Sequence, residues 1–170
     1  MSSTSTIDRG RADVYRCEDL YARMCERANP PSGPILTELA GSRVLLPAER
    51  RFGAVADIDR YLAALRPALT QFWPGTAPEV TVRTRRGPGL AHWEAPNTIA
   101  IPDTCLMRRE HVVLHELAHH LDHHSRTHAA PAHGPAFRAM LCRLHTAAAG
   151  PVGGWALSVL FDQHLDHTCH

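Results

Sequence analysis

The chain has 170 residues, of which 44% are hydrophobic and 21% are charged, an ordinary balance for a globular protein able to bury a core without disulfides. Its formal net charge of +1 provides no overall field that would attract nucleic acid. No apolar run approaches the ~18 residues of a transmembrane helix, so a membrane protein is not expected. The simplest organisation is a single domain over residues 1–170, with residues 1–7 and 166–170 as disordered ends.

The cysteines and the N-terminal residues bear on the compartment. An odd number of widely spaced cysteines without metal-motif spacing is typical of free thiols in a reducing environment: Cys17, Cys25, Cys105, Cys142 and Cys169. Met1 to Thr6 lack the basic segment and apolar run of a signal peptide. We therefore expect a cytoplasmic protein.

The first half of the chain predicts two amphipathic helices. Residues 11–28 carry apolar side chains on one helical stripe, and the Pro- and Gly-containing segment 29–34 ends that helix. A short strand is expected at residues 43–46, and Arg51-Phe52 could begin another. Residues 55–72 predict a second helix, with Pro67 as a kink or late break.

A small sheet is expected next. Residues 79–84 alternate as a half-buried strand, and residues 91–94 and 98–102 could return as one or two more, giving an antiparallel or mixed sheet. The cluster of Arg83, Arg85 and Arg86 could contact nucleic-acid phosphates, although three arginines at a turn are more often simply solvated.

The motif around which the chain is organised lies within residues 112–121, where His115, Glu116 and His119 spell H-E-x-x-H. Residues i and i+4 share one face of a helix, so both imidazoles can point at a single metal ion. Glu116 is turned about 100° from His115, where a carboxylate can take a proton from an activated water. A solvated histidine-rich helix is the alternative, but the apolar flanking residues favour burial, which requires a partner for these polar groups.

Catalytic zinc usually has three protein ligands, so a third must be found. No glutamate follows Glu116, and Asp122 and Ser125 exclude the extended H-E-x-x-H-x-x-G-x-x-H pattern. His133 is the leading candidate, because Gly134-Pro135 would fix it at the turn into a new helix. Four other histidines compete for the role: His120, His123, His124 and His128.

The rest of the C-terminal half is predicted to be helical. A helix over residues 136–149 is followed by a break at residues 150–154 and a last helix over residues 155–165.

Asp122 is either a carboxylate that orients an imidazole or a surface charge. The histidines of the tail suggest a second metal site, although a disordered end is the more common explanation.

These motifs carry two resemblances. H-E-L-A-H-H followed by H-G-P-A-F, within Val112–Phe137, resembles the SprT-like zincin metallopeptidases. Most of the chain is similar to a family of short actinobacterial metallohydrolases that carry H-E-x-x-H. The resemblance implies that His115, His119 and His133 bind Zn²⁺ and that Glu116 is the catalytic base. It also implies that Asn97–Ile101 forms the cleft edge that holds a peptide substrate, although an ordinary structural strand is an equal alternative.

Together these observations predict an α+β, small zincin-like domain, with a short sheet packed on a central H-E-x-x-H helix and flanking helices. The expected function is that of a zinc-dependent metallopeptidase acting on a peptide or protein, with His92 or an arginine of residues 83–86 as a second oxyanion donor. One alternative is a non-catalytic, zinc-stabilised protein-interaction module, with His128 or Asp122 as a fourth ligand. A narrower one is a protease acting on DNA-bound proteins, although no C-x-x-C zinc ribbon is present.

Overall fold

The computed structural model describes residues 10–125 and 131–165, so the predictions for the two chain ends and for His128 lie outside it. The described part is α+β, as expected, and none of its helices is long and apolar enough to cross a membrane. Along the chain the elements are α1 (Arg11–Ala28), β1 (Thr37–Leu39), β2 (Ser42–Val44), α2 (Val55–Leu65), η1 (Arg66–Phe72), β3 (Thr81–Arg85), β4 (His92–Glu94), β5 (Thr98–Pro102), α3 (Glu110–Ser125), α4 (Pro135–Ala149) and α5 (Pro151–Leu165).

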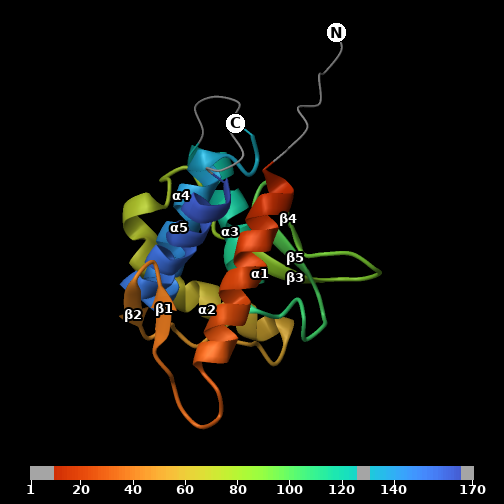
Figure 1. Cartoon of the computed structure of the whole chain (residues 1–170). Helices are drawn as coiled ribbons and strands as arrows, with labels where there is room; N and C mark the ends of the chain where they lie inside the picture. The colour runs from red at the N-terminus through yellow and green to blue at the C-terminus, as the bar shows by residue number, and fades with distance from the viewer. Residues whose placement is uncertain (1–9, 126–130, 166–170) are drawn as a thin grey trace.

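Helix α3, which carries the H-E-x-x-H motif, lies at the centre of the fold (Figure 1). It packs against α4 and against strands β4 and β5, while α1 crosses in front of it and packs against α5. Val113, Leu114, Leu117, Ala118 and Leu121 of α3 are at most 1% exposed. The predicted arrangement of a short sheet on a central helix, with helices before and after it, is therefore confirmed.

The sheet that packs on α3 is mixed, with strand order β3-β5-β4. Strand β5 pairs in parallel with β3 and antiparallel with β4. Its residues Ile99, Ala100 and Ile101 are all 0% exposed, and successive side chains of a strand point to opposite faces, so both faces of β5 are covered. The expectation that Asn97–Ile101 forms a free cleft edge is wrong, because both sides of β5 are already paired. The edge strand beside α3 is β4.

The first half of the chain follows most of the predicted elements, and β1 is an addition to them. Helix α1 has the predicted bounds, whereas the expected strand at residues 43–46 ends at Val44, where β2 pairs with β1 in a hairpin. Arg51 forms only an isolated bridge with Arg109 rather than a strand. The expected late break at Pro67 is confirmed, since α2 gives way there to the 3-10 helix η1; proline lacks the N–H that an α-helix needs.

The predicted break at residues 150–154 is shorter than expected. Gly150 alone separates α4 from α5, in a left-handed conformation with φ of 83°. Gly153 and Gly154 instead lie inside α5, in close contact with neighbouring helices. A Cβ added at Gly154 would lie 2.5 Å from the carbonyl oxygen of Cys142 in α4 and would overlap Thr146. These glycines are therefore required for close packing rather than for a turn.

Candidate metal centre

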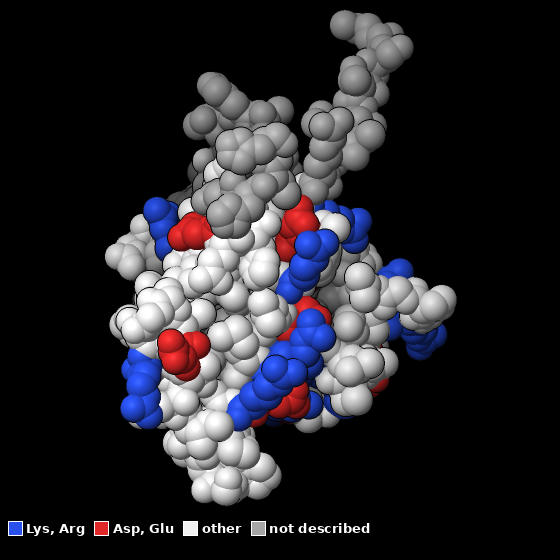
Figure 2. Space-filling view, viewed as in Figure 1, with Lys and Arg blue, Asp and Glu red and all other residues white. Residues whose placement is uncertain are grey.

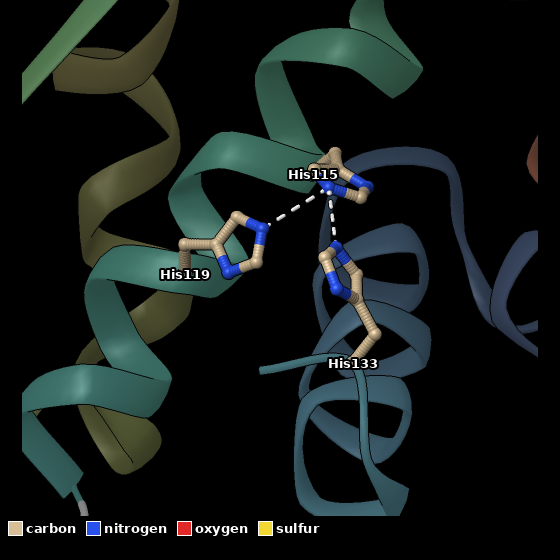
Figure 3. Close-up of side chains that lie close together, drawn as sticks. All are labelled: His115, His119 and His133. Atoms are coloured by element: carbon tan, nitrogen blue, oxygen red, sulfur yellow. Dashed lines mark hydrogen bonds between the residues drawn. The ribbon is translucent and has the colours of Figure 1, made fainter. Parts of the chain in front are cut away.

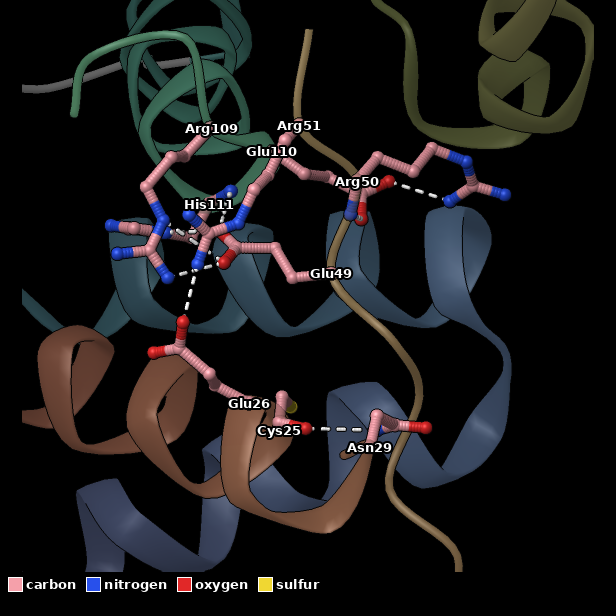
Figure 4. Close-up of polar contacts among 9 residues, drawn as sticks. All are labelled: Cys25, Glu26, Asn29, Glu49, Arg50, Arg51, Arg109, Glu110 and His111. Carbon is pink, nitrogen blue, oxygen red and sulfur yellow. Dashed lines mark hydrogen bonds and ion pairs between the residues drawn. The ribbon is translucent and has the colours of Figure 1, made fainter. Parts of the chain in front are cut away.

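The first turn of α3 is fixed by carboxylates from the segment before α2 and from α3 itself (Figure 4). Glu49 accepts hydrogen bonds from the His111 ring and from Arg109, the latter at 2.5 Å. Glu110, which is 4% exposed, accepts from Arg50 and from the Tyr61 hydroxyl, each at 2.7 Å. Burial alone would raise the pKa of Glu49, but its bonds to His111 and Arg109 lower it to about 2.

The three histidines singled out from the sequence converge (Figure 3). His115 and His119 project from successive turns of α3, and His133 reaches them from the turn that precedes α4. The Nε2 atom of His115 lies 3.1 Å from Nε2 of His119 and 3.3 Å from Nε2 of His133. Their ligand atoms all lie within 4.8 Å of one another, and these residues could hold a metal ion.

The spacing of these nitrogens fits a tetrahedral ion. Two imidazole nitrogens bound at ~2.0–2.1 Å in a tetrahedron lie roughly 3.3–3.4 Å apart, close to the two distances from His115. His115 and His133 are 2% and 6% exposed, and burial of such groups is costly unless they are paired.

A carboxylate that the sequence analysis missed holds the first of these ligands. Oε2 of Glu18, on α1, lies 2.7 Å from Nδ1 of His115, and both side chains are almost completely buried. An ionised carboxylate only accepts hydrogen bonds, so Nδ1 carries the proton and Nε2 presents its lone pair to the other two histidines. This arrangement is typical of metal-binding histidines, whose second nitrogen is oriented by a carboxylate.

Two aromatic rings enclose the histidines. The Tyr15 ring of α1 stacks on His115 with ring centroids 4.7 Å apart. Phe137, which is 0% exposed, contacts all three imidazoles from the first turn of α4, with centroid distances between 4.5 and 5.1 Å. The aromatic residue of the H-G-P-A-F segment is therefore part of the wall of the site and fixes the orientation of the rings.

Glu116 lies beside the histidines in a dry environment. It is 4% exposed, and this burial raises its pKa, opposed by the charge of His115 and by a hydrogen bond with the backbone of Trp93 in β4. A buried carboxylate with a raised pKa is suited to accept and return a proton. The bond to Trp93 also connects Glu116 to the edge strand of the sheet.

A cleft with two halves opens on Glu116. One half, with a cavity volume of about 420 Å³, contains His119, His133 and the edge-strand residues His92 and Trp93. The other half, of about 390 Å³, lies on the far side of Glu116 between α1 and the start of α3. Tyr15, Ala91 and Glu116 line both halves. The carboxylate therefore borders both halves although it is itself buried.

Two of the competing histidines bind carbonyl oxygens instead. Nε2 of His120 lies 3.1 Å from the Pro78 oxygen, and Nε2 of His124 lies 2.8 Å from the Pro96 oxygen. Burial lowers the pKa of His120 to about 4. His123 lines the cleft and packs on Trp93, with ring centroids 4.8 Å apart.

Asp122, the carboxylate considered for an orienting role, is 4% exposed and lines the cleft beside His119. It is therefore not the surface charge that the sequence allowed. The carboxylate on His115, however, is Glu18.

Three of the residues considered as oxyanion donors or nucleic-acid contacts bond groups in or just before β4. His92 lies in the cleft, with Nε2 2.8 Å from Glu94. Arg83 pairs with the same Glu94, and Arg85 donates to the Leu90 carbonyl oxygen at 2.9 Å. On the face shown in Figure 2, basic residues lie beside acidic ones along α1 rather than in a basic patch.

In comparisons with known proteins, no family model, curated protein or solved structure matches the chain.

Proposed function

We propose that the protein is a zinc-dependent metallohydrolase of the zincin type, a metallopeptidase with His115, His119 and His133 as metal ligands and Glu116 as general base. The observation that carries this proposal is the convergence of three imidazole nitrogens beside a buried carboxylate at the base of an open cleft. Free thiols in the described part of the chain agree with the cytoplasmic location we propose.

The donor set supports zinc as the ion. Three neutral imidazoles with no cysteine among them form a typical catalytic zinc site, in which a fourth position remains for water or substrate. Glu18 strengthens this assignment, since it fixes the tautomer in which Nε2 of His115 is free to bind. Other divalent ions that accept imidazole ligands compete by availability rather than by geometry alone.

Different groups around the site would carry out different steps of peptide hydrolysis. When bound, the ion supplies a Lewis acid that activates water and polarises the scissile carbonyl. Glu116 accepts a proton from the attacking water as the new C–O bond forms, and returns it to the nitrogen as the C–N bond breaks. His92 is the candidate donor to the developing oxyanion, because it lines the same part of the cleft as Glu116.

The edge strand β4 is the proposed contact for the substrate backbone. Within the described residues it has a partner strand on one side only, β5, and its residues His92 and Trp93 line the cleft next to Glu116. An extended peptide can add to such an edge through main-chain hydrogen bonds, which suits unfolded or flexible protein segments as substrates.

Cleavage of an unfolded protein, followed by mass spectrometry, tests the proposal. Zinc-loaded native protein is expected to cut the substrate, and Glu116→Gln is expected to bind zinc equally but to lose at least ~10²-fold in rate, because the base is removed and the ligands are kept. His124→Ala, outside the cleft, is the control for general effects of substitution in α3. Equal activity of native protein and Glu116→Gln would contradict the proposal, and equal inactivity with zinc bound would favour a structural zinc module.

A further inference from the structure

The half of the cleft between α1 and the start of α3 differs in chemistry from the half that contains His119 and His133. Its walls are largely aliphatic and come from four separate parts of the chain: Ala12, Leu90, Ala91, Met107 and Val112. Its volume of about 390 Å³ is in the range of small-molecule binding pockets. Large apolar side chains are also left in solvent here, since Leu90 is 51% exposed and Leu106, next to Met107, is 66% exposed.

Apart from Glu116, which both halves share, the charged groups that line this half are paired within the chain. Glu18 binds His115, and the His111 ring binds Glu49. At the rim, Arg16 pairs with Asp13 at 3.5 Å, and Asp19 pairs with Arg23 at 2.5 Å. A charged ligand would therefore have to compete with existing ion pairs, whereas an apolar one would cover the aliphatic walls and gain their burial. Figure 2 shows mainly uncharged surface beside the charged residues of α1, on the side of the β3–β4 loop.

We propose that this half of the cleft binds a large apolar side chain of the substrate, such as that of Leu, Met or Phe, next to the scissile bond. The position of the pocket next to the scissile bond rests on the proposed peptidase function. Binding of an apolar group in the pocket does not depend on that function. Its position follows from the shared residues: Glu116 and Tyr15 line both halves. A peptide that crosses Glu116 therefore places a neighbouring side chain in the aliphatic half.

Ala12 offers a substitution that reduces the pocket and leaves the three metal ligands and Glu116 unchanged. It lies on the exposed side of α1 and is not among the buried residues of that helix. Ala12→Trp would occupy the space between α1 and Val112. Ala63→Trp is the matched control, because Ala63 is also an exposed alanine on a helix, α2, and lines neither half of the cleft.

Binding is tested first, without turnover, by titrating zinc-loaded protein with N-acetyl-L-leucinamide or N-acetylglycinamide and recording methyl NMR spectra. The leucine amide is expected to shift the signals of Leu90, Met107 and Val112 in native protein and in Ala63→Trp but not in Ala12→Trp, and the glycine amide to shift none. The proposal is overturned if the leucine amide leaves these signals unchanged, or shifts them equally in Ala12→Trp.

Cleavage gives a second readout. Peptides with Leu beside the cut are expected to exceed those with Gly by about tenfold or more in kcat/KM, a selectivity that Ala12→Trp should abolish. Cuts flanked mainly by charged residues would overturn the inference. If the leucine amide binds as described while no peptide is cut, the apolar pocket stands and the proposed hydrolysis fails.

Discussion

The buried pair of Glu18 and His115 gives the sharpest prediction for the metal site. Glu18→Gln keeps the size and a hydrogen-bond acceptor but removes the negative charge that polarises the His115 ring. The second carboxylate oxygen, Oε1, accepts no hydrogen bond from the described residues, so the new amide displaces no partner. Removing such an orienting carboxylate typically lowers metal affinity by about 10- to 100-fold, or roughly 1.4–2.7 kcal/mol.

The assay is a competition titration of zinc against a chromophoric chelator at fixed pH. Glu26→Gln is the matched control, because Glu26 lies on the same helix but is exposed and pairs with Arg51 at the surface; we expect its zinc affinity to equal that of native protein. Circular dichroism of the metal-free proteins separates a loss of affinity from a loss of fold. A zinc affinity of Glu18→Gln equal to that of Glu26→Gln would refute the role assigned to the Glu18–His115 bond.

Two further predictions concern stability. The folded-state pKa of Glu49, about 2, lies below its ordinary 4.5. Its contribution to the free energy of unfolding, at most roughly 3 kcal/mol, is therefore present above pH 4.5 and is lost as the pH falls toward 2. Urea unfolding should show a smaller loss of stability at acid pH for Glu49→Gln than for native protein, and parallel pH profiles of the two proteins would exclude this. Gly154→Ala should destabilise by about 1–3 kcal/mol through overpacking against Cys142, whereas Gly75→Ala, with no atom within 4 Å of the added Cβ, should change thermal stability little; equal melting temperatures would contradict the close α4–α5 packing.

The parts of the site that were predictable are those governed by local spacing. His115 and His119 share a helical face because they are four residues apart, and His133 was favoured because Gly134 and Pro135 place a turn beside it. In the structure the three converge. The helices flanking the motif were predicted in the same way, from apolar periodicity, which is a local signal.

The parts that were not predictable depend on contacts between distant segments. Glu18 lies 97 residues from His115, although its position on the buried stripe of α1, four residues after Val14 and three before Tyr21, is a signal that could have identified it. The order of the sheet is likewise a tertiary property: nothing within residues 98–102 shows that β3 and β4 pair on either side of them. Gly153 and Gly154 of α5 were predicted to belong to a turn, because their packing against α4 cannot be inferred from the sequence.

The most direct test of the central claim is the zinc content per chain, measured by elemental analysis of native protein, His133→Ala and His123→Ala after purification without added chelator. The proposed centre predicts about one zinc in native protein and in His123→Ala, and little or none in His133→Ala, because only the last loses one of the three converging ligands. Absence of metal from the native protein after incubation with zinc, or full retention by His133→Ala, would contradict it.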